Sequence, residues 1–309
     1  MKRILLITLI LICLASAPLF ITNEYVFNLI ILISLYVILS HAWNILGGYT
    51  GQVSLGHSTF FGMGALVFRY VWSAGLSPYL ALGAGAVASL LLAAVIGFPA
   101  LKLKGHYFAI GTLALAMIAL ITVQNILPGV SFLPPQFLQG YSLIPVYYMA
   151  LIVGMITTGL IYGLAHSKVG VALACVREDE EAAEAIGINT FKFKVISMSL
   201  STLLAGLGGG VFSFYVASYY YYVPFDLGWA FDPVLISFIG GAGTLTGPIL
   251  GSVVFVLLKE LFAISLGQMN VLIFGIVFIL TVLFFPKGII GIPQLLRRRK
   301  PSVPLVKKI

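Results

Sequence analysis

Charged residues are scarce in this 309-residue chain. Asp, Glu, Lys and Arg make up 8% of it, whereas about a quarter of an ordinary globular chain is charged. Hydrophobic residues make up 61%. This balance excludes a soluble domain and predicts a chain that lies in a membrane along most of its length. With about 20 residues per span and short loops, the length allows about ten crossings in one all-α, polytopic helical bundle.

The residue patterns that would carry chemistry are also missing. The two cysteines, Cys13 and Cys175, are expected in a span and in a loop, so a disulfide framework is not expected. The four histidines form no H-E-x-x-H pattern, and no G-x-x-x-x-G-K-[ST] phosphate loop occurs. We therefore expect no catalytic residues, no metal and no cofactor in this chain. It is not predicted to be an enzyme, and any ATP-driven step would need a partner.

The net charge of +8 comes from basic residues that mark loops, not from a face that would bind nucleic acid. They gather at residues 2–3, 102–104, 168–194, 287 and 297–308. The positive-inside rule places these regions, and both termini, in the cytoplasm. Arg69 and Lys259 instead fall within expected spans, where we expect them near the outer ends with side chains that could snorkel. Glu24, Asp226, Asp232 and Glu260 show no evident pairing.

Ten apolar segments separated by Pro, Gly or charge are expected to span the membrane. They lie near Ile4–Ile21, Tyr25–Leu46, Leu55–Trp72, Pro78–Leu101, Tyr107–Leu127, Ile144–Ala165, Phe193–Tyr215, Leu227–Ile239, Pro248–Leu266 and Val271–Phe285. The eighth segment is short and could be re-entrant. Residues 1–296 thus form one transmembrane domain, and residues 297–309 form a basic cytoplasmic tail.

The first segment has a second interpretation. Its basic start, apolar run and small residues Ala15, Ser16 and Ala17 also resemble a cleavable secretory signal. Pro18 would stand at the new N-terminus, which disfavours cleavage, and the apolar run continues to Ile21. We expect a retained first span.

A glycine- and hydroxyl-rich stretch, Gly47–Ala65, lies between long hydrocarbon runs. Because glycine disfavours a helix interior, this density predicts backbone that bends or is approached closely. Polar groups such as those of Gln52, Ser54 and His57 survive in a membrane only when buried in protein or facing a watery cavity. The stretch is therefore expected to pack helices together or to line a translocation pathway, and both readings stay open. A second glycine-rich stretch, Gly240–Gly251, faintly resembles it.

One long polar loop, residues 166–190, holds five of the nine acids: Glu178, Asp179, Glu180, Glu181 and Glu184. These acids and the nearby alanines predict a short helix whose acidic start suits the helix dipole and whose end is set by Gly187. Such a short helix is not stable alone, so something must hold it. It could merely connect two spans, but its charges and small residues favour a cytoplasmic docking element.

Three stretches together resemble the LivM-type permease subunits of branched-chain amino acid ABC importers. They are Gly47–Ala65 with its Gly-Gln-Val-Ser-Leu-Gly-His core, Arg177–Asn189 with Glu-Ala-Ala and Gly-Ile-Asn, and Ile239–Pro248. The resemblance covers residues 25–295. It implies that an ATPase-coupling segment contains Arg177, Glu178, Asp179, Glu181, Ala182, Ala183 and Gly187. It further implies two membrane motifs for helix packing or the pathway, with residues Gly51, Gln52, Ser54, Gly56, His57, Gly240, Gly241, Gly243, Gly247 and Pro248.

The resemblance also implies a complex in the inner membrane of a prokaryote. This chain would pair with a LivH-like second permease, with two ABC ATPase subunits that bind ATP and Mg inside, and with an amino-acid-binding protein outside. Lipid would surround it, and no nucleic acid is implied. The substrates would be leucine, isoleucine and valine, moved by alternating access; related permeases carry urea or amides. A self-sufficient carrier and a membrane-embedded enzyme remain alternatives, disfavoured because no coupling pair or catalytic constellation stands out.

Overall fold

The structure is a computed structural model that describes residues 13–18, 20, 23–133, 141–266, 275–276, 279 and 288–291. Most of the first expected span, most of the tenth (Val271–Phe285) and the tail at residues 297–309 lie outside this part. Five described helical segments are long and apolar enough to cross a membrane, and helix α12 is apolar but shorter. An all-α membrane protein is thus supported, whereas the count of about ten spans stays a prediction.

Helices make up most of the described chain. They are α2 (Glu24–Asn44), α3 (His57–Ser73), α4 (Pro78–Leu92), α5 (Phe98–Ala100), α6 (His106–Ile126), α8 (Leu143–Ala165), α9 (Lys168–Glu178), α10 (Glu180–Ala185), α11 (Thr190–Tyr215), α12 (Gly228–Gly240) and α13 (Thr246–Leu266). Two π-helical turns, η1 (Ile45–Tyr49) and η2 (Ala93–Gly97), extend α2 and α4, and short 3-10 turns occur at η3 (Val223–Phe225) and η5 (Ile289–Gly291).

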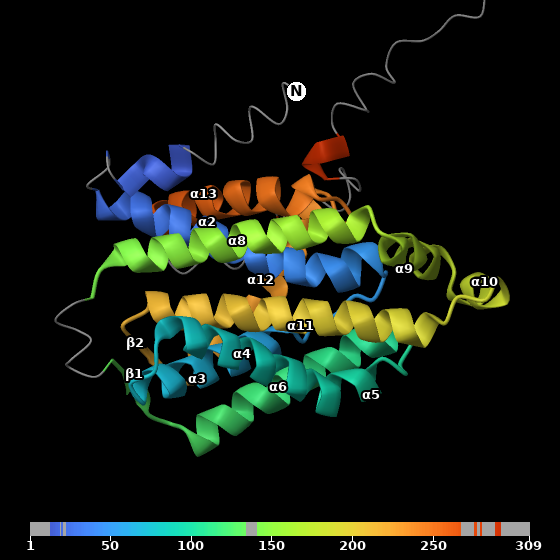
Figure 1. Cartoon of the computed structure of the whole chain (residues 1–309), viewed down its shortest axis with the longest axis horizontal. Helices are drawn as coiled ribbons and strands as arrows, with labels where there is room; N and C mark the ends of the chain where they lie inside the picture. Colours follow the sequence, from blue (N-terminus) through green and yellow to red (C-terminus); the bar gives the residue numbers. More distant parts are fainter. Residues whose placement is uncertain are drawn as a thin grey trace, which may run out of the picture.

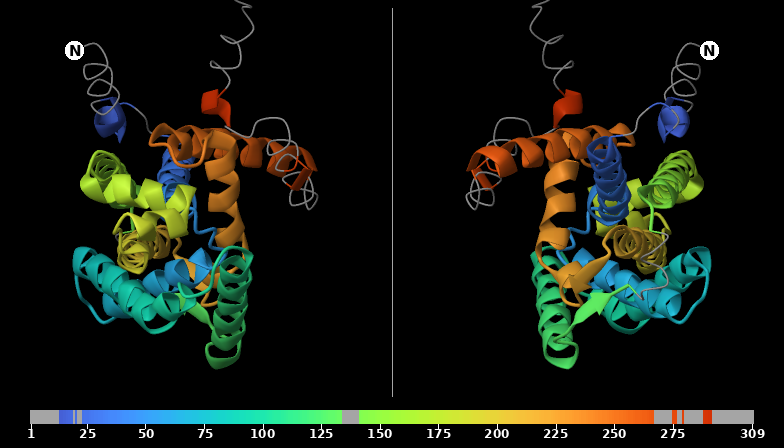
Figure 2. Two further views of the ribbon diagram at one scale, coloured as in Figure 1. Left: turned by 90° about the vertical axis from the view of Figure 1, so that its right-hand side faces the viewer. Right: turned by 90° about the vertical axis from the view of Figure 1, so that its left-hand side faces the viewer.

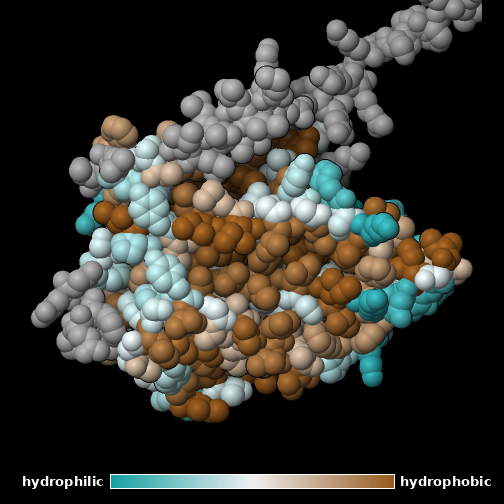
Figure 3. Space-filling view, in the orientation of Figure 1, coloured by the Kyte–Doolittle hydropathy of each residue, from teal (hydrophilic) through white to brown (hydrophobic). Residues whose placement is uncertain are grey.

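The bundle has two chemically different ends (Figure 1). Helices α2, α8 and α11 run along its long axis, α9 and α10 protrude at one end, and strands β1 (Val130–Phe132) and β2 (Ser218–Tyr220) pair antiparallel at the other. Hydrophobic residues cover the middle of the face in Figure 3, and the most hydrophilic residues gather mainly at the α9–α10 end. Figure 1 places α5, which precedes Lys102 and Lys104, at this same end, as the charge pattern predicts.

Small residues let α3, α4 and α11 approach until their backbones touch. A Cβ atom on Gly64 would lie 2.2 Å from the carbonyl oxygen of Gly206, and one on Gly209 would lie 1.9 Å from that of Phe61. Both separations are far below van der Waals contact, so only glycine fits at these crossings. Van der Waals packing of this kind is the main force that holds helices together in a membrane.

Arg69 does not snorkel, so that expectation is wrong. Its side chain is buried, and its guanidinium donates hydrogen bonds to the carbonyl oxygens of Ser213 at 2.7 Å, Val216 at 2.5 Å and Ala217 at 3.3 Å. It also lies 4.8 Å from the centre of the Tyr219 ring. The last carbonyls of a helix have no partner within the helix, so a buried arginine satisfies them and fixes the end of α11.

The eighth expected span is an irregular segment followed by a short helix. Helix α12 has 13 residues, about 20 Å of helix at 1.5 Å per residue, which is less than the hydrocarbon thickness. In Figure 2, where α2, α8 and α11 are seen nearly end-on, α12 is seen from the side and runs across the direction of those helices. Before it, Phe225 of η3 packs on Gly62 of α3, and in the first turn of α12 Trp229 stacks on Phe61. Helix α13 then runs back against α2 and α12.

Candidate functional site

The protruding polar loop consists of two capped helices. Ser167 accepts a hydrogen bond from the Gly170 N–H at 3.2 Å at the start of α9. The Asp179 carboxylate caps α10 by accepting from the N–H groups of Glu181 at 2.9 Å and Ala182 at 3.0 Å. Gly187 follows with a φ of 89°, a left-handed value that suits glycine and ends the helix. The prediction of a short helix with an acidic start and a terminal glycine is confirmed; α9 was not foreseen.

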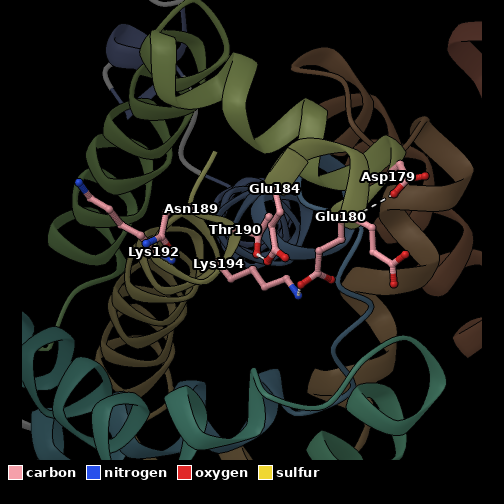
Figure 4. Close-up of polar contacts among 8 residues, drawn as sticks. Asp179, Glu180, Glu184, Asn189, Thr190, Lys192 and Lys194 are labelled. Carbon is pink, nitrogen blue, oxygen red and sulfur yellow. Dashed lines mark hydrogen bonds and ion pairs between the residues drawn. The ribbon is translucent and has the colours of Figure 1, made fainter. Parts of the chain in front are cut away.

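Two contacts with α11 hold α10 in place (Figure 4). The ammonium of Lys194, whose side chain is only 2% exposed, lies 2.5 Å from a carboxylate oxygen of Glu180. The Thr190 hydroxyl donates a hydrogen bond to a Glu184 carboxylate oxygen at 2.5 Å, and Ala183 is buried on the inner face of α10. Breaking a buried ion pair leaves an uncompensated charge, so this arrangement resists rotation of α10. The helix that is too short to stand alone is therefore fixed by the membrane domain.

The residues on the outward face of the protrusion differ from the predicted ATPase-coupling residues. Ala182 and Glu181 are exposed, but Ala183 packs inward, so it cannot belong to a docking surface. Ile186, by contrast, was missed, and its side chain is 73% exposed. An isoleucine between Ala185 and Gly187 in an acidic loop is the signal that could have found it, because an exposed apolar side chain among charges can anchor a partner.

Arg177 joins the protrusion to both glycine-rich stretches. Its guanidinium donates a hydrogen bond of 2.8 Å to the carbonyl oxygen of Gly48, at the π-helical end of α2. Asn44 links this end of α2 to the second glycine-rich stretch. Its side-chain oxygen accepts a hydrogen bond from the Gly243 N–H at 2.8 Å, and its side-chain amide donates one to the Thr244 carbonyl at 3.0 Å. We call Asn44, Gly48, Gly51, Arg177 and Gly243 the glycine junction.

The backbone at the glycine junction leaves no room for side chains. A Cβ atom on Gly48 would lie 1.9 Å from the Asn44 side-chain oxygen and 2.5 Å from the Gly243 nitrogen. Gly51 and Gly243 both have a φ of 76°, and a Cβ on either would lie within 3.3 Å of Arg177. Three segments that are far apart in the sequence thus meet through backbone contacts. Asn44 was not among the predicted site residues, although a single amide side chain in an apolar run could have indicated it.

The rest of the second motif forms the turn between α12 and α13. A Cβ on Gly240 would lie 1.8 Å from the Gly247 carbonyl oxygen, and Gly241 has a φ of 125°. The Thr244 hydroxyl donates to the Gly241 carbonyl at 2.7 Å and accepts from the Gly247 N–H at 3.0 Å. Pro248 follows, buried, in the first turn of α13. These residues shape the end of α12 at the glycine junction.

Most of the first motif packs helices together. The Ser54 carbonyl accepts from the Trp43 indole N–H at 2.8 Å, and Gln52 is buried with its N–H donating to the Leu46 carbonyl at 2.8 Å. A Cβ on Gly56 would lie 2.8 Å from the Thr112 carbonyl oxygen. Gly56 and its neighbours therefore allow these segments to pack in close contact.

His57 is fully buried between three helices. Its Nε2 lies 2.8 Å from the Ser201 hydroxyl oxygen on α11, and that hydroxyl donates to the Ala42 carbonyl of α2 at 2.7 Å. Its Nδ1 and the Gln52 Oε1 are buried without a hydrogen-bond partner among the described residues. The arrangement favours the packing interpretation of His57, since the ring bridges α3 to α11 and α2.

The proteins that this chain resembles identify its family. Residues 25–282 match the family described as "Branched-chain amino acid transport system / permease component". The chain belongs to this permease family. It is 26% identical to the "High-affinity branched-chain amino acid transport system permease protein LivM" of Escherichia coli K12, over 92% of this chain and 75% of that protein. It is 25% identical to the Salmonella typhimurium LivM, over 84% and 69% of the two chains.

An archaeal relative matches as well. The "Probable branched-chain amino acid transport permease protein LivM" of Methanocaldococcus jannaschii is 24% identical over 72% of each chain. No solved structure matches the permease. The resemblance to LivM-type permeases is therefore confirmed, and the chain is a multi-pass inner-membrane permease component, consistent with the expectation that it is not an enzyme. Among the residues that the structure describes, no group of three or more His, Cys, Asp or Glu side chains could hold a metal.

The permease contains an ion pair that sequence reasoning missed. The Lys259 ammonium lies 3.1 Å from a carboxylate oxygen of Asp232 and donates to the Tyr36 hydroxyl at 2.8 Å, and that hydroxyl donates to the same Asp232 oxygen at 2.9 Å. We call Tyr36, Asp232 and Lys259 the polar triad. The expectation that Asp232 is unpaired is wrong, because α12 and α13 bring together residues 27 positions apart.

Proposed function

We propose that the permease is the membrane-spanning subunit of an ATP-driven importer that moves leucine, isoleucine and valine by alternating access. The observation that carries the mechanism is the Arg177 contact, which joins a rigid protrusion to both broken segments of the membrane domain. The printed names of the bacterial and archaeal relatives, all branched-chain amino acid permeases, support the substrate class.

The proposed complex contains a LivH-like second permease, two ABC ATPase subunits that hold ATP and Mg, and an extracytoplasmic binding protein. The α9–α10 end and both chain termini face the cytoplasm in this scheme. When the ATPase subunits close, they displace α10, and the contacts of Lys194 and Arg177 carry the displacement to α11 and to the end of α2. The turn into α13 moves with them because it is bonded to Asn44. Binding energy thus drives a conformational change without chemistry on the substrate.

The chemistry of the docking surface defines its partner groove. Ala182 offers a flat contact, Ile186 offers an apolar anchor, and Glu178, Asp179 and Glu181 supply negative charge around them. We expect the ATPase groove to have an apolar floor and a basic rim, because complementary charge sets orientation while the buried apolar anchor contributes most of the affinity.

Ala182→Arg tests the docking assignment. The added side chain would project from the exposed face of α10 into the partner groove, so we expect loss of coupled ATPase stimulation and of ATPase subunits that co-purify, with membrane insertion unchanged. The measurement is gentle solubilisation and mass spectrometry of the bound subunits. The matched control is Ala74→Arg, an exposed alanine in the loop after α3, which should keep the ATPases bound. If Ala182→Arg also keeps them and their stimulation, the docking assignment is wrong.

A further inference from the structure

The polar triad lies well inside the membrane. Its Tyr36 lies midway along the 26-residue span Glu24–Tyr49, so its Cα is about 18 Å along the helix from either end. The Tyr36 ring stacks on Trp229, 5.6 Å between centroids, and meets Phe255 at 5.2 Å. The triad thus joins α2, α12 and α13 at a depth where water is normally absent.

The ion pair is open on one side. Within the described part of the chain, the Lys259 side chain is 45% exposed and that of Asp232 is 19% exposed. Figure 2 shows α13 at the edge of the described molecule. A charged lysine that faces lipid at this depth costs several kcal/mol, so intramembrane charges face protein or a water-filled cavity. We therefore expect the ion pair not to face lipid in the working complex.

We propose that Asp232 and Lys259 form a binding site for a zwitterionic solute, in a watery route that a second permease subunit completes. The inference rests on the proposed function and deepens it by naming residues and a ligand class. Opposite charges 3.1 Å apart match a solute that carries an ammonium and a carboxylate on the same carbon atom. Tyr36 and Asp232 take two of the three Lys259 protons within the described part of the chain, which leaves one for a solute carboxylate.

The surroundings fit an amino acid with an aliphatic side chain. The Phe255 ring centre lies 5.3 Å from the Lys259 ammonium, and the partly buried Phe262, one turn after Lys259, lies on the same face of α13. Helix α12 then connects the site to the glycine junction: Asp232 lies near its start, and Gly241 and Gly243 follow its end. A solute that pulls on Asp232 therefore acts on the helix whose following turn meets Arg177 at Gly243, so site occupancy and ATPase position bias one element.

Thiol labelling tests whether the α13 face is watery. In the assembled complex, with Cys13 and Cys175 replaced by serine, Phe262→Cys and Leu235→Cys, one turn from Lys259 and Asp232, should react with a charged, membrane-impermeant thiol reagent about tenfold faster than Ile118→Cys and Ile121→Cys. The last two lie exposed on the apolar helix α6 and serve as lipid-facing controls. Equal rates at all four positions would mean that lipid or another part of the chain covers Lys259, and would overturn the proposal.

Protection from labelling tests the ligand class. Millimolar leucine should slow labelling of the Phe262→Cys variant several-fold, whereas leucinamide, which lacks the carboxylate, and isocaproate, which lacks the ammonium, should not. If leucine protects no better than these two, the zwitterion site is wrong. Failure of the proposed function has a separate signature, since the unmodified complex would then show no ATP-dependent leucine uptake whatever the labelling rates.

A double variant separates binding from a purely structural ion pair. Asp232→Asn with Lys259→Met removes both charges at once, so it avoids the unpaired charge that either single variant would leave. We expect an intact complex whose KM for leucine rises about tenfold or more, the loss typical of charge-assisted hydrogen bonds. Uptake with an unchanged KM would show that the pair only holds α12 against α13 and would overturn the proposal.

Discussion

Replacing Arg177 by methionine should uncouple the permease while leaving its ATPase partners bound. The change removes the guanidinium that bonds to the Gly48 carbonyl but keeps an unbranched side chain beside Gly51 and Gly243. Because Arg177 lies on α9 and not on α10, the outward face around Ala182 and Ile186 stays as it is. The protrusion would then dock normally but no longer pull on the end of α2.

The size of the effect follows from one charge-assisted hydrogen bond of 2.8 Å. Such bonds contribute about 1.5–3 kcal/mol, and we take about 1.5 kcal/mol because the contact is only part-buried. If Arg177 makes this bond only while the assembled complex moves, its loss lowers the coupling of ATP hydrolysis to uptake by about tenfold. Gly48 is itself buried, so the carbonyl left without a partner adds to the cost.

The assay is uptake by proteoliposomes per ATP hydrolysed, measured beside co-purification of the ATPase subunits. Arg177→Met should lower uptake per ATP about tenfold at unchanged subunit content, and Arg177→Lys, which keeps a donor without the planar fork, should fall between. Unchanged uptake per ATP would refute the role of the glycine junction in transmission. Loss of the ATPase subunits would instead show that Arg177 acts by docking.

Two further predictions concern packing. Gly209→Ala should destabilise the bundle by about 1–3 kcal/mol, because its Cβ would lie 1.9 Å from the Phe61 carbonyl oxygen. Gly159→Ala on α8, where a Cβ meets nothing within 4 Å, should not destabilise it. Thermal unfolding in detergent measures both variants, and equal melting temperatures would contradict this packing. Arg69→Met should lower stability by about 2–4 kcal/mol because three carbonyls at the end of α11 lose a buried donor. The same melting assay checks it, and a wild-type melting temperature would show that those carbonyls need no arginine.

Five of the expected spans and the short acidic helix could be predicted because their signals are local. Runs of apolar residues mark helices, the acids at residues 178–181 and Gly187 mark the start and end of α10, and basic residues mark one end of the bundle. The glycines of both motifs could be expected to permit close contact. Their common meeting point could not, because it depends on the relative rotation and depth of α2, α9 and α12.

Pairings between distant residues escaped prediction for the same reason. Arg69 and Lys259 look alike in the sequence, as single basic residues in apolar runs, yet one is buried on the end of α11 and the other lies half-exposed against Asp232. Ala182 and Ala183 are neighbours of which the first is exposed and the second buried, and only the contacts of α10 with α11 decide which one faces out. Single-residue signals thus indicate that a group needs a partner, and the fold decides which partner it finds.

The most direct test of the account is uptake of labelled leucine by proteoliposomes that contain the permease, its second permease, both ATPase subunits and the loaded binding protein. The account predicts uptake that requires ATP inside the vesicles, is competed by isoleucine and valine but not by urea, and is lost in Ala182→Arg. Leucine uptake without ATP by the permease alone, or ATP-dependent uptake of urea in its place, would contradict it.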